Sequence, residues 1–348
     1  MKDFDRVLRT DLVDGFWKGI RADDPKLIYL LKENPEISRD DLGKCVPLFL
    51  HGDKVEFVND DSLMVWHIGS VLASRTSMYS GLLLGVSPAK IEVMEDGGTW
   101  NPVWEGRWAP SFRAMLYGKT VDGTEIHNSG WRFCIWLLIG DHEHFANALK
   151  LPRWNNPEYC WNCAVRKSAA NPLAGRKFPE GTSGFPMRPI ESEAGERIGK
   201  HIVFNIHGVT SHNVCHDALH VLYVNGIGNH ALGSALYDLC WRSGPGRPKE
   251  KLAAIWERAQ ALYTESGCLS RLTNLRLNMF LDPDRPRQQH PMLKAKGAEC
   301  KHFIPVMATI SAEISVGVPA RDEHRTGALK SLSDFGELLD NCGMVPPK

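Results

Sequence analysis

Two aspartates follow apolar segments in the same way and could together hold a divalent metal ion. Asp53 follows the letters "PLFLHG", and Asp141 follows "IWLLIG". Each carboxylate would lie where a buried strand leaves its sheet, and adjacent strands would bring the two together. Carboxylates that meet repel each other unless a cation neutralises them, and their hard oxygen atoms suit Mg²⁺ or Mn²⁺. Such a site can activate water and stabilise phosphoryl displacement. Gly-Asp is also common in turns, so a purely structural role is the alternative.

A second group of residues could bind zinc. Cys160 and Cys163 form a Cys-x-x-Cys pair, which is half of a tetrahedral zinc site. His216 and His220, four residues apart, would share one helical face and could complete it. Buried reduced thiols are the alternative for the cysteines, because free Cys is often buried. His212 and Cys215 compete with them as ligands. Asp217 offers another interpretation, in which it pairs with His220 through a hydrogen bond.

Elements that could position these groups can be read from the hydrophobic pattern. Residues 46–53 and 54–58 predict two short strands, and the continuously apolar segment 133–139 predicts a strand that is buried on both faces. Apolar residues at helical spacing predict helices over 252–263 and 329–339. Prolines, glycines and serines predict a loop over 167–190. The sequence therefore predicts an α/β protein in which strands precede helices.

Composition restricts the function classes. The chain has 348 residues, of which 43% are hydrophobic and 24% are charged, as in ordinary globular proteins. No apolar run approaches the roughly 20 residues of a membrane span, and the N-terminal letters contain no apolar signal core, so we expect no membrane association and no secretion. Nine scattered cysteines predict reduced thiols, and hence the cytoplasm or the nucleus. The 41 basic and 41 acidic residues cancel, so DNA binding would need a local basic surface.

Three segments together resemble a known family. The letters "VPLFLHGDKVEF", "LIGDHEHFANALKLPRWNNPEYCWNC" and "HDALHVLYVNGIGNHALGSALYDL" are similar to the catalytic core of CACTA-type (EnSpm-like) DDE transposases, including the divergent copies in dinoflagellate genomes. The resemblance covers roughly residues 40–245. It implies a ribonuclease-H-like mixed sheet with a large, mainly helical, zinc-bearing insertion. It also implies that Asp53 and Asp141 are the first two of three metal-binding acids, with Cys160 and Cys163 in the insertion.

The resemblance also implies a domain organisation. We expect a helical preamble over 1–44, the ribonuclease-H-like core strands over 45–165, a loop over 166–200, and the helical insertion with C-terminal helices over 201–348. The third acid of the family has no obvious equivalent, and Glu299 in "KAKGAECKHFIPV" is the best substitute. A solvated glutamate in a charged helix is the alternative for Glu299. A truncated or inactive copy would fit the missing acid.

Three functions follow from these patterns. The first is transposase-like cleavage and transfer of DNA at transposon ends in the nucleus. This function is compatible with a homo-oligomer. The second is a non-catalytic derivative that binds zinc and nucleic acid. The third is an unrelated metallohydrolase, which would recruit His142 or His144 from "GDHEH" as a metal ligand. For DNA contact, the sequence offers a local basic run that includes Arg285, Arg287, Lys294 and Lys296.

Overall fold

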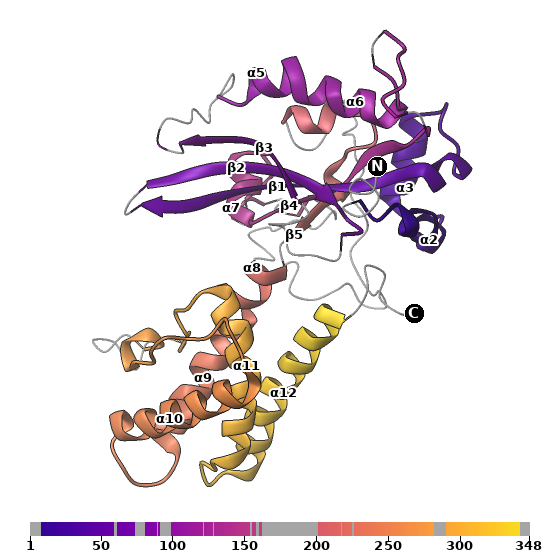
Figure 1. The fold of residues 1–348 in the computed structure, drawn as a ribbon. Helices are drawn as coiled ribbons and strands as arrows, with labels where there is room; N and C mark the ends of the chain where they lie inside the picture. Colours follow the sequence, from indigo (N-terminus) through magenta and orange to yellow (C-terminus); the bar gives the residue numbers. More distant parts are fainter. Residues whose placement is uncertain are drawn as a thin grey trace. The chain divides into compact units, whose positions relative to one another are not determined.

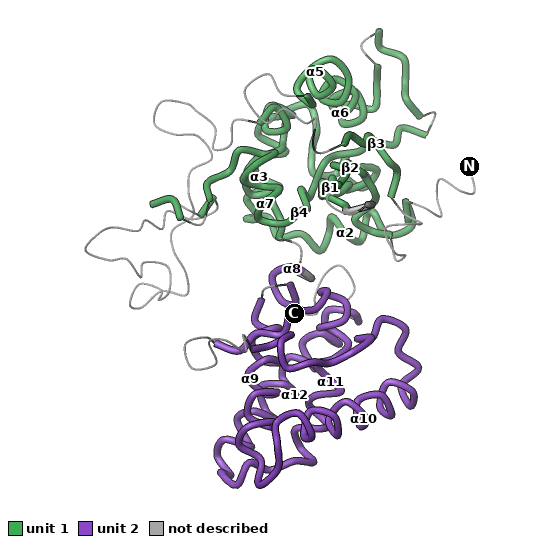
Figure 2. The backbone as a smooth tube through the Cα atoms, turned by 90° about the vertical axis from the view of Figure 1, so that its left-hand side faces the viewer, with its two compact units in different colours: residues 1–216 green, residues 217–348 purple. Residues whose placement is uncertain are grey.

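The chain folds into two compact units, Met1–His216 and Asp217–Lys348 (Figure 2). The structure is a computed structural model, and it describes residues 8–58, 61–73, 81–88, 90, 99–120, 122–127, 129–153, 155–157, 160–161, 201–216, 218–224, 226–281 and 290–341. The division falls after His216, so residues 201–216 belong to the unit that contains the strands, whereas the expected domain organisation groups them with the later helices.

The first unit is built on a five-stranded mixed sheet with the order β3-β2-β1-β4-β5 (Figure 1). β1, β2 and β3 form an antiparallel meander, while β4 runs parallel to β1 and β5 runs parallel to β4. The central strand is therefore β1. The strands are β1 (Cys45–Val58), β2 (Asp61–Ser70), β3 (Gly81–Pro88), β4 (Arg132–Gly140) and β5 (Val214–His216).

Helices of the first unit lie before β1, between β3 and β4, and after β4. Figure 1 shows α5 and α6 over one face of the sheet, where they form part of the crossover that a parallel β1/β4 pair requires. The helical elements are η1 (Thr10–Leu12), α2 (Val13–Gly19), α3 (Pro25–Glu33), η2 (Asp40–Lys44), α5 (Asn101–Val103), η4 (Trp104–Trp108), α6 (Ala109–Tyr117), α7 (His142–Asn147), η5 (Ile202–Asn205) and η6 (Ser211–Asn213).

Strand β1 differs from the prediction in one respect that matters for function. Residues 46–58 were expected to form two strands, but β1 is one strand of 14 residues that continues through Gly52 and Asp53. Val46, Leu48 and Leu50 are buried on one face, and Phe49, His51 and Asp53 are half-buried on the other. The turn interpretation is therefore wrong for Asp53. The buried strand expected at 133–139 is confirmed as β4.

The second unit is helical and has its own apolar core. Helix α11 packs against α8, α9, α10 and α12 and supplies buried residues such as Phe303, Met307 and Ile310. The helices predicted over 252–263 and 329–339 are confirmed within α10 and α12. The elements are α8 (Ala218–Tyr223), α9 (Ile227–Arg242), α10 (Pro248–Ser266), η7 (Leu277–Met279), α11 (Gly297–Glu313) and α12 (Pro319–Asn341).

Candidate functional site

The two aspartates come from neighbouring parallel strands. Asp53 lies in β1, and Asp141 directly follows β4. The register between β1 and β4 is given by their paired residues: Phe49 pairs with Leu137, and His51 pairs with Ile139. Continued by two residues, this register places Asp53 level with Asp141. In a parallel pair, residues at the same level point to the same face, so this continuation past the last pair would put both aspartates on one face of the sheet.

A bulge in β4 produces this register. Up to the pair Leu48 and Ile135, each β4 residue has a number 87 higher than its partner in β1. From the pair Phe49 and Leu137 onward, the difference is 88. Trp136 is the extra residue. Without it, Asp53 would lie level with Gly140, and Asp141 would point to the opposite face, because side chains alternate along a strand.

Contacts on both sides hold the bulge in place. The Trp136 ring packs edge-on against the rings of Phe16 and Trp17, with centroid separations of 6.0 and 4.9 Å. The Asn213 side chain donates hydrogen bonds to the carbonyls of Ile135 and Trp136, with donor–acceptor distances of 3.4 and 3.2 Å. Buried backbone carbonyls need such partners, so Asn213 compensates for the local loss of the strand ladder.

Both carboxylates are half-buried and bonded to nearby backbone. Asp141 is the N-cap of α7, and its Oδ1 accepts a hydrogen bond from the His144 backbone N–H at 2.6 Å. Asp53 Oδ1 accepts from the Lys54 backbone N–H at 2.7 Å. Carboxylate oxygens of this kind are the hard ligands that Mg²⁺ or Mn²⁺ prefers. In each aspartate, Oδ1 accepts the backbone hydrogen bond, and this bond helps to fix the orientation of the carboxylate.

His144 has a structural position behind the acids. Its side chain is buried, and a Cβ added to Gly52 would lie only 2.2 Å from His144 Cε1. The ring also contacts Trp66 edge-on, at a centroid separation of 4.9 Å. Burial, together with the neighbouring His51 and His201, lowers the pKa of His144 to about 3. His144 is thus a core residue of α7 that packs against Gly52 of β1.

A histidine pair lies beside Asp53 that the sequence analysis did not identify. His51 and His67 are cross-strand partners on β1 and β2, and their ring centroids are 4.6 Å apart. Burial, and to a lesser extent His51, lower the pKa of His67 to about 4, and Asp53 opposes the shift. His67 shares the face of Asp53. Only the strand pairing reveals this, because residues 51 and 67 have no informative spacing.

An aromatic cluster near the end of β4 consists of His142, Phe145, Trp161 and His216. Trp161 lies near the other three, with centroid separations of 5.6 Å to His142, 5.6 Å to Phe145 and 4.9 Å to His216. Phe145 and Trp161 are buried, whereas His216 is exposed. Burial lowers the pKa of His142 and of His216, and the neighbouring His142 also lowers that of His216.

The structure places the expected zinc ligands in different elements, and some of them lie outside the described residues. His216 lies in β5 and His220 in α8, so the expectation that both share one helical face is wrong; pairing with β4 holds His216 in an extended conformation. Cys160 is partly buried and reduced. Cys163 and Asp217 lie outside the described residues. Among the residues that the structure describes, no three His, Cys, Asp or Glu side chains converge in a way that could hold a metal ion.

The remaining predicted residues belong to the second unit. Glu299 is in the first turn of α11, where Oε2 accepts a hydrogen bond from the Lys296 backbone N–H at 2.9 Å. This carboxylate is therefore a helix cap, and its role as a third acid stays a prediction. The side chains of Lys294 and Lys296 are exposed. Arg285 and Arg287 lie outside the described residues.

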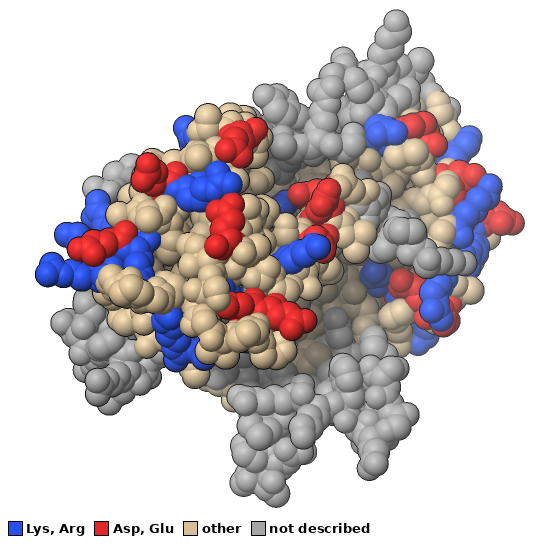
Figure 3. Space-filling view, turned by 90° about the horizontal axis from the view of Figure 1, so that it is seen from below, with Lys and Arg blue, Asp and Glu red and all other residues tan. Residues whose placement is uncertain are grey.

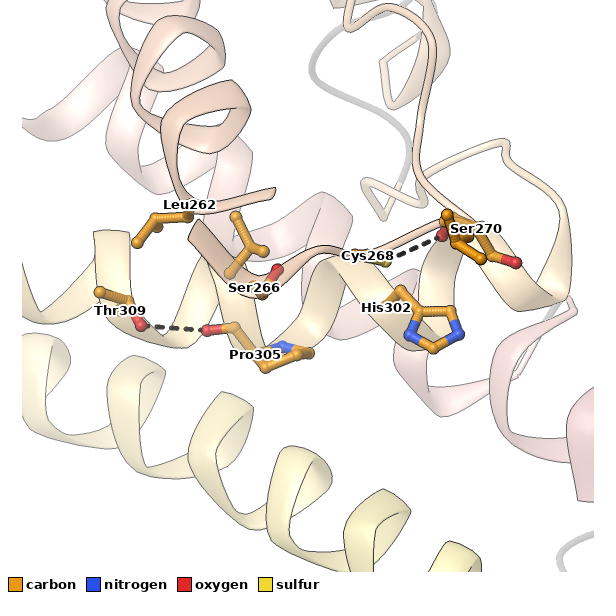
Figure 4. Close-up of a pocket in the computed structure, with 9 residues that line it drawn as sticks. Leu262, Ser266, Cys268, Ser270, His302, Pro305 and Thr309 are labelled. Atoms are coloured by element: carbon orange, nitrogen blue, oxygen red, sulfur yellow. Dashed lines mark hydrogen bonds between the residues drawn. The ribbon is translucent and has the colours of Figure 1, made fainter. Parts of the chain in front are cut away.

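The second unit also contains an open cavity of about 540 Å³ (Figure 4). It lies between the end of α10, the loop that follows and one side of α11. The lining residues are Leu262, Ser266, Cys268, Leu269, Ser270, His302, Pro305, Val306 and Thr309. None of these carries a carboxylate, so the cavity lacks the oxygen ligands that a Mg²⁺ site requires.

Comparison of the chain with known protein families, with curated proteins and with solved structures found no match in any of the three. None of the helices in the described part of the chain is long and apolar enough to cross a membrane. The arrangement of residues in the first unit is therefore the basis for any proposal about function.

Proposed function

We propose that the first unit is a ribonuclease-H-like catalytic core of a transposase-like polynucleotidyl transferase, which cleaves and transfers DNA strands at transposon ends. The observation that carries this proposal is the register that brings Asp53 and Asp141 level on one face of the sheet. The strand order also supports it, because an antiparallel meander extended by parallel strands beside its first strand is the arrangement of a ribonuclease-H-like sheet.

In this proposal the two aspartates hold Mg²⁺ or Mn²⁺ against the scissile phosphate of DNA. Metal bound there would supply Lewis acidity to the phosphate and lower the pKa of the attacking water. Asp53 and Asp141 keep their orientation through the backbone hydrogen bonds to Lys54 and His144. The bulge at Trp136 keeps the carboxylates on the same face. Zinc binding by the Cys160 and Cys163 pair remains part of the proposal.

The position of His144 favours this function over an unrelated metallohydrolase. A metallohydrolase would use His142 or His144 as a metal ligand, but His144 is buried against Gly52 and Gly140. His142 stacks on Trp161 at a centroid separation of 5.6 Å. Both imidazoles thus have packing roles, and the carboxylates are the better ligands for a hard cation.

A non-catalytic derivative that binds DNA is the second candidate, and the position of Glu299 favours it. Two-metal phosphoryl transfer needs enough anionic ligands for two ions about 4 Å apart. Glu299 already caps α11, so a third carboxylate for the second ion is not evident among the described residues. We therefore expect this chain to cleave DNA poorly or not at all, even if Asp53 and Asp141 bind one Mg²⁺ or Mn²⁺. If Glu299 is the third acid, its replacement will abolish cleavage as completely as replacement of either aspartate.

Nicking of supercoiled plasmid DNA with Mn²⁺ or Mg²⁺ tests the catalytic proposal. Asp53→Asn and Asp141→Asn should each lower the nicking rate by about 100- to 1,000-fold, as loss of one electrostatic stabiliser does. Asn is also a good N-cap, so Asp141→Asn should retain α7. Asp40→Asn, an exposed carboxylate of the same unit, is the control and should keep the full rate. Nicking that survives Asp141→Asn would contradict the assignment of the acids.

A further inference from the structure

Strand β3 is an exposed apolar edge of the sheet. Among the described residues it is the outermost strand on the side away from β1 (Figure 1). Leu82, Leu83 and Val86 have exposed fractions of 64, 66 and 43%. No residue of β3 is charged. Proteins commonly protect an edge strand with lysines or cover it with another element, because its outer N–H and C=O groups can pair with a further strand. The composition of β3 therefore favours an edge that another strand covers.

The pairing with β2 shows which side chains of β3 share a face of the sheet. Leu83 pairs with His67, and Val86 pairs with Val65. His67 and Val65 are two residues apart in one strand, so they point to the same face, and their partners point there too. Leu84 has no partner in β2. This one-residue bulge explains why positions 83 and 86, which are three residues apart, lie on one face.

A second copy of β3 matches this pattern of faces. When two copies pair antiparallel about a two-fold axis at the middle of Gly81–Pro88, Leu83 of one copy lies opposite Val86 of the other. Both belong to one face, as opposite residues of a strand pair must. Leu82 then lies opposite Ser87, and the pairing with β2 places both of these on the other face. The two exposed side chains that share a face, Leu83 and Val86, would therefore cover each other twice in the pair.

We infer that two copies of this chain associate through β3, as an antiparallel β3–β3 pair that joins their sheets. A charged peptide would find no side chain of opposite charge on β3, whereas two neutral strands bring no like charges together. A two-fold contact of this kind is closed, so it leaves neither copy with an exposed β3 edge. The contact does not involve the proposed acids, so the dimer goes beyond the proposed function and does not depend on it.

The joined sheet has a defined geometry. Asp53 pairs with Val65 of β2, so it lies on the same face as Leu83 and Val86. Strands that pair antiparallel keep their faces on the same sides of the sheet. The faces that bear Asp53 in the two copies would thus lie on one side of the joined sheet.

Sedimentation of the full chain over a range of concentrations tests this association. The wild type should form a dimer that dissociates on dilution. Leu83→Lys and Val86→Glu should each raise the Kd of the dimer by about 10- to 100-fold, because each removes two apolar contacts that the two-fold axis relates. Leu269→Lys makes the same change at an exposed leucine of the second unit and should leave the Kd unchanged.

The double variant with Leu83→Lys and Val86→Glu tests the register of the pair. Each introduced lysine would lie opposite the introduced glutamate of the other copy, and cross-strand pairs of opposite charge are stabilising. The double variant should therefore dimerise more tightly than either single variant. A general loss of apolar surface would instead make it the weakest of the three.

Three outcomes would overturn the β3–β3 dimer. A wild type that stays monomeric at every concentration would leave the edge to a different strand, such as a segment of another protein. A dimer that Leu83→Lys does not weaken would have its contact elsewhere. A double variant that dimerises no more tightly than the single variants would exclude the two-fold register. None of these results bears on the acids, which the nicking assay tests separately.

Discussion

At the scale of single residues, Gly52 allows the acid-bearing strand to pack on α7. The Gly52 backbone lies under the buried ring of His144, and an added Cβ would come within 2.5 Å of His144 Nε2 and 3.0 Å of Trp66 Cζ3. Real Cβ atoms do not approach so closely, and neither ring has space to move because both are buried. The glycine before Asp53 is thus required by packing rather than by a turn.

Gly52→Ala should therefore destabilise the first unit by about 1–3 kcal/mol, the usual cost of overpacking a core. Chemical unfolding followed by fluorescence measures this change in the free energy of unfolding. Gly15→Ala in α2 is the matched control, because a Cβ there would meet no atom within 4 Å. The control should be neutral or stabilising by up to about 1 kcal/mol, since Ala favours helices more than Gly does. Equal effects of the two substitutions would refute the packing argument.

At the scale of elements, the β4 bulge determines whether the two acids can cooperate. The bulge changes the register between β1 and β4 by one residue, and a change of one residue moves side chains to the other face. Asn213, at the end of η6, binds the two carbonyls at the bulge. A short element next to β5 thereby influences a site that it does not contact.

Asn213→Ala should reduce nicking by more than its loss of stability explains. Removing this side chain leaves the carbonyls of Ile135 and Trp136 without its hydrogen bonds, at a cost of about 1–3 kcal/mol. The comparison is Asn229→Ala, another buried asparagine, which donates to the Leu293 carbonyl at 2.7 Å in the second unit. Nicking rates measured well below each variant's unfolding temperature should fall only for Asn213→Ala. A similar fall in both variants would indicate general destabilisation.

At the scale of the whole molecule, electrostatics limits how the chain could bind DNA. The net charge is zero, and Figure 3 shows basic and acidic side chains interspersed over the face in view. No long-range field would therefore attract DNA. Affinity must come from local interactions between cationic side chains and phosphates, and such interactions release counterions and weaken with salt.

Replacing Lys294 and Lys296 by Gln should lower DNA affinity and reduce the slope of log affinity against log salt by about 1.8, or about 0.9 for each phosphate that is no longer neutralised. Arg285→Gln and Arg287→Gln should add a similar change. Lys249→Gln with Lys330→Gln alters the net charge equally on α10 and α12 and should leave the slope unchanged. Titrations at several salt concentrations measure these slopes. If the Lys249→Gln and Lys330→Gln variant lowers the slope as much as the Lys294 and Lys296 variant does, net charge and not local interaction determines binding.

Much of the local structure could be predicted from the sequence, because it depends on periodicity. The helices over 252–263 and 329–339 show apolar residues at helical spacing, and the strand at 133–139 is continuously apolar. Strand β5 has only three residues, and such a short segment carries no pattern of its own. The helical position expected for His216 failed for this reason, since pairing with β4 determines its conformation.

The sequence by itself determined that the protein is of the α/β class, with an acid after each of two apolar segments and a helical C-terminal part. Only the tertiary structure decided that β1 and β4, which lead to Asp53 and Asp141, are parallel neighbours, that His144 is a core residue, and that His216 joins the aromatic cluster. Those features depend on strand register and on contacts between residues far apart in the chain. A one-residue bulge changes register without changing the apolar pattern, so only the paired strands reveal it.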